Sequence, residues 1–259
     1  MKKIVLLLVV VVIICGWQIK KKNTDEVIPS QTDYSVEGSS EEPLEENSEK
    51  LSGESKKKEE KNKENVYKEQ MDLVYQALSQ EWSVDKYFEN EISSLISNHY
   101  EENALENVGY ALKDLDGDGK DELIISTVSK DYSAGMIYDV YSAPNGKVVH
   151  VLSGHERNRY YLQWMEEGAY MIANESSNSA FNSAWYYYTL TEGKLELVQG
   201  VVFNAAEDEN NPWFITYDED WDTSNDTHDT EGLAQSVIET NLKSYTALDY
   251  IPFSSYSNQ

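Results

Sequence analysis

The chain has 259 residues, of which 47 are acidic and 21 basic, and its formal charge at pH 7 is -26. A charge of this sign repels a phosphate backbone, so we expect no nucleic acid among its partners. A hydrophobic content of 40%, with 12% aromatic residues, is enough to fill a core and excludes a chain that is disordered throughout.

Residues 1–22 have the pattern of an export signal. Two lysines precede an apolar run over residues 4–17, and lysines follow at positions 20–22 without a small-residue cleavage site. The run makes a helix of about 21 Å, shorter than a hydrocarbon core of about 30 Å, but flanking tryptophan and lysine side chains can extend it. We expect an uncleaved membrane anchor that holds the protein on the extracellular face of the cell. Lipidation at Cys15, the only cysteine, is the open alternative.

The composition changes over residues 23–65. This segment holds 13 acidic and six basic residues, and Tyr34 is its only aromatic residue. It cannot bury enough apolar surface to offset the entropy of ordering, so we predict a disordered acidic tether. Since the rest of the chain has no cysteine, its folded part has no disulfide, which leaves room for calcium as a stabilising link.

The folded domain is predicted to span residues 66–259 and to begin with two amphipathic helices. Apolar residues recur at helical spacing in two groups. These groups are Tyr67, Met71, Val74 and Leu78, then Phe88, Ile92, Leu95, Ile96 and His99. Ser83 stands where it can cap the second helix. We expect His99, at the end of an apolar stripe, to be a core residue rather than a ligand.

After residue 108 the apolar period changes from 3.6 to 2. Val108, Tyr110 and Leu112 alternate with other residues, and turn signals at 144–146 and 192–193 help to divide the rest of the domain into strands. A last helix is predicted near the C-terminus, over about 231–244. The expected fold is therefore α+β. It comprises an N-terminal helical pair, an antiparallel meander of about eight or nine strands in one extended sheet or two blade-like sheets, and a C-terminal helix.

The sequence DLDGDGKDE, which begins at Asp114, lies between two predicted strands. Counting Asp114 as position 1, Asp116 and Asp118 stand at positions 3 and 5 and a glycine at position 6, as in the first half of a calcium loop. Position 12 is an isoleucine, so a helix-loop-helix calcium hand is not expected. Glu122 at position 9 can supply the missing carboxylate, and Lys120 at position 7 a carbonyl. We predict that these five residues bind Ca²⁺ in a strand-loop-strand turn.

The loop resembles the FG-GAP/VCBS-type calcium loop of β-propeller blades, whose pattern D-x-D-x-D-G-x-x-[DE]-L is met from Asp114 to Leu123. Over most of residues 66–254 the chain is similar to a group of exported Gram-positive bacterial proteins. The similarity is carried by NVGYA at 107–111, IYDVY at 137–141, NPWF at 211–214, WDTSND at 221–226 and PFS at 252–254. It implies export and calcium binding but no activity, because none is established for the group. The chain has one such loop rather than one per blade, so we do not expect a complete propeller.

A second acidic run follows at residues 218–226, with carboxylates at alternate positions. No glycine follows them, and Trp221 interrupts the run. A second cation site and an ordinary acidic turn are both compatible with this sequence, and we favour the turn.

The sequence predicts no catalytic residues. Its four histidines lack zinc-site spacing, and no G-x-S-x-G motif is present. The aromatic residues at 185–188, with Trp164, Trp213 and Trp221, could stack on sugars if exposed, although filling the core is the interpretation we prefer.

We therefore expect a surface-tethered extracellular calcium-binding module without catalytic activity. A carbohydrate- or cell-wall-binding module that uses exposed aromatic residues is the alternative, and a hydrolase is the third interpretation. The expected partners are the membrane, through the N-terminal segment, and a cell-wall glycan or a surface protein.

Overall fold

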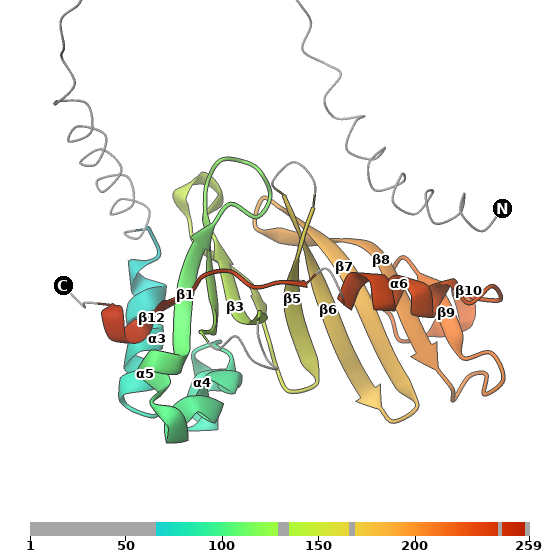
Figure 1. Cartoon of the computed structure of the whole chain (residues 1–259), viewed down its shortest axis with the longest axis horizontal. Coiled ribbons are helices and arrows are strands. Elements are labelled where there is room, and N and C mark those ends of the chain that lie inside the picture. Colours follow the sequence, from blue (N-terminus) through green and yellow to red (C-terminus); the bar gives the residue numbers. More distant parts are fainter. Residues whose placement is uncertain (1–65, 129–134, 166–168, 243–244, 257–259) are drawn as a thin grey trace, which may run out of the picture. The chain divides into compact units, whose positions relative to one another are not determined.

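The computed structural model describes four stretches of the chain, residues 66–128, 135–165, 169–242 and 245–256. They belong to one structural unit, most of which is a single antiparallel sheet of twelve strands (Figure 1). Helices precede the first strand and follow the long strands, so the predicted α+β class is confirmed. The anchor predicted over 1–22 and the tether predicted over 23–65 lie outside the described residues.

Nine strands of four or more residues follow one another along the chain. They are β1 Val108–Lys113, β2 Glu122–Thr127, β3 Met136–Ser142, β4 Val149–Ser153, β5 Asn158–Trp164, β6 Tyr170–Ser179, β7 Asn182–Thr191, β8 Lys194–Asn204 and β9 Trp213–Thr216. Three two-residue strands complete the sheet: β10 Thr227–His228, β11 Tyr245–Thr246 and β12 Ile251–Pro252. These short strands make the count larger than the eight or nine predicted, because two paired residues carry no readable alternation.

The order across the sheet is β10-β9-β8-β7-β6-β5-β3-β2-β1-β12, with β4 paired to β3 and β11 to β5. Strand β3 has two partners on one side: Met136 and Ile137 pair with β5, and the residues from Asp139 onwards pair with β4. Strand β12 returns to β1, where Pro252 lies opposite Gly109. The last strand of the chain therefore closes the edge formed by the first.

The helical segments are α3 Lys68–Ser79, α4 Val84–Glu89, the 3-10 helix η1 Ser94–Glu102, α5 Ala104–Asn107 and α6 Leu233–Leu242. Short 3-10 turns lie at η2 Pro144–Gly146, η4 Thr223–Asn225 and η5 Phe253–Ser255. The first predicted helix corresponds to α3 and the last to α6.

The second predicted helix is not continuous. It ends at Glu89, the chain turns through Glu91 in a left-handed conformation (φ 53°), and a 3-10 helix follows. Ser83 occupies the N-cap position of α4, but its side chain makes no capping hydrogen bond. Phe88, predicted to lie on the apolar stripe, is 57% exposed because the helix stops one residue later.

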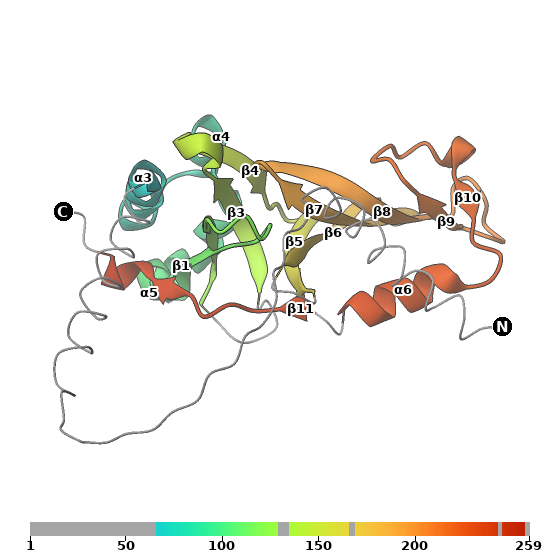
Figure 2. The same cartoon turned by 90° about the horizontal axis from the view of Figure 1, so that it is seen from above.

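Helices pack on the sheet in two places (Figure 2). Residues of α3, α4 and η1 form one core with β1, β2 and β3, and Phe253 near the C-terminus is fully buried in it. Ala234 and Ile238 of α6 pack against Val201 of β8 at the other end of the sheet. His99 is half-buried with its Nε2 2.6 Å from the Tyr138 hydroxyl, and burial lowers its pKa.

Candidate metal centre

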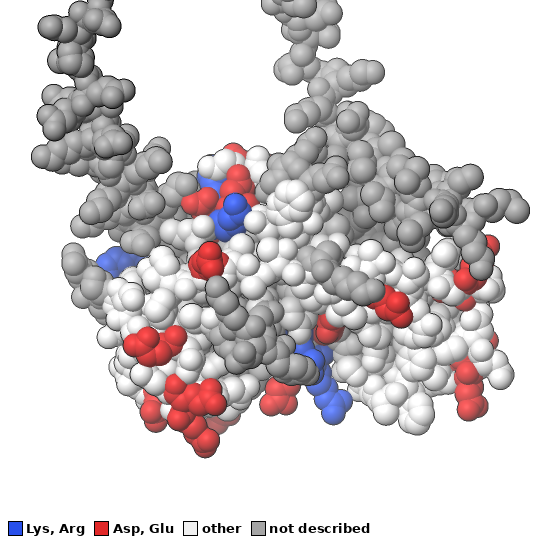
Figure 3. Space-filling model, viewed as in Figure 1, with Lys and Arg blue, Asp and Glu red and all other residues white. Residues whose placement is uncertain are grey.

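The acidic loop connects β1 to β2. Lys113 pairs with Glu122 across the two strands, so the ends of the loop are held side by side and residues 114–121 form the connection. Acidic side chains gather at this end of the two strands, with basic ones among them (Figure 3). Gly117 and Gly119 have φ values of 77° and 86°, a left-handed conformation that is unfavourable for residues with a Cβ atom. These two glycines therefore allow the loop to curl tightly on itself.

Backbone N–H groups of the loop point to its own carboxylates. Asp114 accepts hydrogen bonds from Gly117 N at 2.7 Å and from Gly119 N at 3.0 Å. Asp116 accepts from Asp118 N at 3.1 Å. The chain thus wraps around the Asp114 carboxylate, and the side chains of Asp114 and Asp116 turn inward.

Glu122 approaches the loop from the sheet. Its side chain is buried, with 3% of the residue exposed, and accepts hydrogen bonds from Leu115 N at 2.9 Å and from the Ser142 hydroxyl at 3.0 Å. Burial raises the pKa of Glu122 to about 7, and the charges of Asp116 and Asp118 add to the rise. Sequence reasoning missed Ser142, because nothing in the chain signals that a residue 20 positions away would reach this carboxylate.

Three of the five predicted ligands come together. Carboxylate oxygens of Asp114, Asp116 and Glu122 lie within 4.8 Å of one another, and among the described residues this is the one group of three or more metal-binding side chains at that spacing. Two oxygens bound to the same Ca²⁺ ion, each at roughly 2.3–2.6 Å, can be at most about 5 Å apart. The group can therefore hold a metal ion without a large rearrangement.

The other two predicted ligands are placed differently. The Asp118 carboxylate accepts from Lys120 N at 2.7 Å and forms an ion pair with Lys120 Nζ at 3.1 Å. It lies outside the convergent group, and its side chain is exposed. The Lys120 carbonyl remains a predicted ligand.

Residues 218–226 do not form a comparable group. Asp220 N donates to Asp218 at 3.1 Å, Asp222 N donates to Asp220 at 3.1 Å, and Ser224 N donates to Asp222 at 3.0 Å. These hydrogen bonds form a ladder of Asx turns, and the carboxylates of 218–226 are not grouped at the spacing found in the first loop.

The aromatic residues at 185–188 lie mostly inside the molecule. Tyr186 and Tyr188 are buried on one face of the sheet, and Tyr187 is buried on the other with Val237 of α6. Consecutive tyrosines are buried because both faces of β7 are covered. These three rings are therefore closed to a sugar.

The chain matches no protein-family model, no curated protein and no solved structure. Its likeness to the FG-GAP/VCBS loop thus stays a prediction that rests on the ten residues of the motif. No helix in the part of the chain that the structure describes is long and apolar enough to cross a membrane.

Proposed function

We propose that the protein is an exported, surface-tethered calcium-binding module without catalytic activity, in which the ion fixes the connection between β1 and β2. The convergence of Asp114, Asp116 and Glu122 carries the proposal. Three carboxylates at this spacing repel one another, and a cation removes that repulsion. The FG-GAP/VCBS-like pattern supports the same ion.

Calcium fits this donor set better than other common divalent ions. All the candidate ligand atoms are oxygens, whereas zinc prefers nitrogen and sulfur ligands. Magnesium demands near-ideal octahedral geometry at about 2.1 Å, which a loop held by its own hydrogen bonds does not readily reach. Affinities of calcium sites in extracellular modules are on the order of 10⁻⁴ to 10⁻³ M, and we expect this range here.

Thermal unfolding of the full chain in a non-ionic detergent tests the proposal. Calcium at a hundredfold excess over its Kd should add about 2.7 kcal/mol to the free energy of unfolding and raise the Tm by about 5–10 °C relative to chelator. The same concentration of magnesium should raise it much less.

Two double variants make the test specific. Asp114→Asn with Asp116→Asn should abolish the calcium-dependent rise. Asp220→Asn with Asp222→Asn, which removes two carboxylates of the same spacing from the other acidic run, should leave the rise intact. Equal Tm values in calcium and chelator for the unmodified chain, together with no heat of binding by calorimetry, would show that the loop is only an acidic turn.

A further inference from the structure

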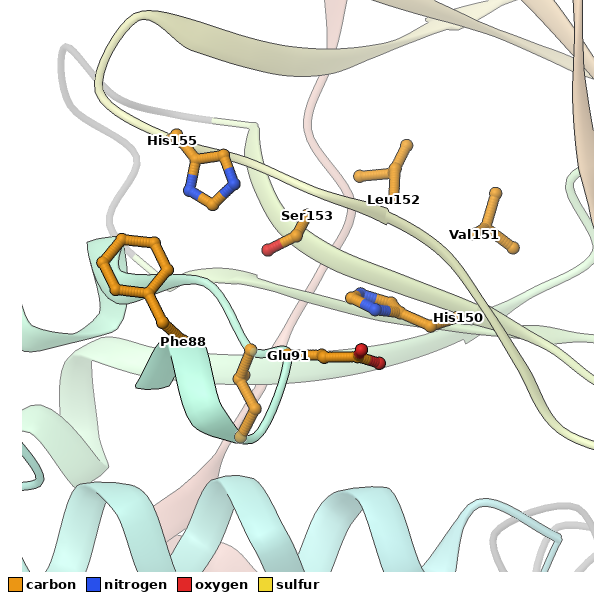
Figure 4. A pocket seen from close by; sticks show the side chains of 8 residues that line it. Phe88, Glu91, His150, Val151, Leu152, Ser153 and His155 are labelled. Atoms are coloured by element: carbon orange, nitrogen blue, oxygen red, sulfur yellow. The ribbon is translucent and has the colours of Figure 1, made fainter. Parts of the chain in front are cut away.

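A pocket of about 400 Å³ lies between the end of α4 and strand β4, outside the acidic loop (Figure 4). Phe88 and Glu91 line it on the helix side. His150, Ser153 and His155 line it on the strand side. No local pattern groups these residues, because 59 positions separate Glu91 from His150.

One irregularity in strand pairing assembles the polar side of the pocket. The pairing of β3 with β4 shifts by one residue between Val140 and Tyr141. Ser153 lies opposite Asp139 before the shift, and His150 lies opposite Tyr141 after it. In a regular strand, residues three apart point to opposite faces, so the extra residue in β4 is what puts His150 and Ser153 on the same face.

The ring of His150 contacts Asp139 and Tyr141 of β3. Its Nε2 lies 3.0 Å from Oδ1 of Asp139. Asp139 is completely buried, and its Oδ2 accepts the backbone N–H of Ser93 at 3.1 Å. The ring stacks on Tyr141 with centroids 4.6 Å apart. With the Asp139 carboxylate as acceptor, Nε2 carries a hydrogen, and the orientation of the ring is fixed.

Two other polar side chains of the pocket, Ser153 and Glu91, have oxygen atoms that can accept hydrogen bonds. Ser153 Oγ is buried and, within the described residues, has no hydrogen-bond partner. Glu91 contributes an exposed carboxylate, and no lysine or arginine lines the pocket. At the rim, the exposed ring of Phe88 lies 6.1 Å from the ring of His155. The pocket thus combines acceptors, a negative charge and an aromatic face.

We propose that this pocket binds the primary ammonium group of a small organic amine. An ammonium has three donors and no acceptor, which complements the acceptor oxygens of Glu91 and Ser153. Its charge pairs with Glu91 and is attracted to the face of Phe88. The net charge of the chain, -26, favours the approach of cations and disfavours anions. This site does not depend on calcium in the acidic loop.

Saturation-transfer NMR on the full chain in detergent tests the proposal with three probes of equal length: n-butylammonium, n-butanol and butyrate. Only n-butylammonium should receive saturation, and added salt should weaken its binding. Nα-acetyl-lysine methylamide, as a fourth probe, distinguishes a free amine from the ammonium of a peptide side chain. Binding of either amine supports the proposal.

The variants locate the binding. Glu91→Gln should weaken n-butylammonium binding about fivefold and Phe88→Ala about threefold. Glu89→Gln removes an exposed carboxylate two residues away that does not line the pocket, and it should have no effect. Equal Tm values for the two glutamine variants confirm that both are folded. Equal binding of n-butanol, no binding of either amine, or unchanged binding in Glu91→Gln would each overturn the proposal.

Discussion

Two hairpins of the sheet carry acidic residues at the same spacing and differ in structure. Counted from the first aspartate, both loops have carboxylates at positions 1, 3, 5 and 9. These are Asp114, Asp116, Asp118 and Glu122 between β1 and β2, and Asp218, Asp220, Asp222 and Asp226 between β9 and β10. Both loops are closed by antiparallel pairing, yet only the first brings three carboxylates together.

The two loops differ at positions 4 and 6. Gly117 and Gly119 stand there in the first loop with positive φ, whereas Trp221 and Thr223 stand there in the second. In the first loop Asp114 accepts from residues three and five positions ahead, so the chain wraps around it. In the second loop each aspartate accepts from the residue two positions ahead. In these two loops, alternate carboxylates therefore converge only where glycines allow left-handed turns and a buried glutamate lies beside the loop.

The largest expected effect concerns position 9. Glu122→Ala leaves the Leu115 N–H and the Ser142 hydroxyl without their buried acceptor, and each lost partner costs about 1–3 kcal/mol. We expect the free energy of unfolding in chelator to fall by about 4 kcal/mol. Asp226→Ala, at the same position of the second loop, should cost less than about 1 kcal/mol because that residue is partly exposed. Urea unfolding of the two variants measures the two losses in free energy of unfolding. Equal losses would show that the residue at position 9 is no more important to the first loop than to the second.

The second prediction concerns pH. Burial raises the pKa of Glu122 to about 7, well above its ordinary value of 4.5. The folded protein therefore holds the proton of Glu122 more tightly than the unfolded chain does. Protonated Glu122 contributes its full share of the free energy of unfolding below pH 4.5, and this share is lost as the pH rises through 7. Between these two pH values, with chelator present, the free energy of unfolding of the unmodified chain should fall by about 3 kcal/mol more than that of Glu122→Gln, whose side chain does not titrate.

Calcium should abolish this pH dependence near neutrality, since the ion favours the charged carboxylate. Burial also raises the pKa of Asp226, but this group is more exposed, so Asp226→Asn should alter the pH dependence less. Urea unfolding between about pH 4.5 and 8 measures both effects. If the free energy of unfolding of Glu122→Gln varied with pH as that of the unmodified chain does, the pH dependence would not come from Glu122.

The third prediction tests the glycines. Gly117→Ala and Gly119→Ala should each destabilise the protein by about 1 kcal/mol, because alanine is strained at positive φ. Neither substitution creates a clash, since no atom lies within 4 Å of the added Cβ. Both should also weaken calcium binding in calorimetry. An unchanged free energy of unfolding would show that the loop does not need its left-handed turns.

The smallest expected effect is a gain. Trp221→Gly with Thr223→Gly gives the second loop the glycine pattern of the first. In an Asp114→Asn, Asp116→Asn background, this change should create at most a weak calcium site, because Asp226 is less buried than Glu122. Calorimetry measures the stoichiometry. A site as tight as that of the unmodified chain would show that glycine spacing alone is sufficient.

Local pattern in the sequence predicted the acidic loop, its flanking strands and the helices α3 and α6. These features depend on short-range spacing, which a single sequence displays. The break after Glu89, the bulge in β4 and the hydroxyl of Ser142 depend on packing between distant segments, so they had no local signal. The burial of three consecutive tyrosines in β7 also had no local signal. Helix α6 covers one face of this strand, and the sequence of the strand does not show that a distant helix packs there.

The return of β12 to β1 has a consequence for the order of folding. Residues 251–252 are needed to close the edge beside β1, and Phe253 fills a core otherwise built from α3 to β3. A chain synthesised from its N-terminus therefore cannot complete this core until Phe253 has been made. Contacts over so long a sequence separation are slow to form, and until then β1 exposes an unpaired edge. Truncation by as few as eight C-terminal residues should thus destabilise the core formed by α3 to β3.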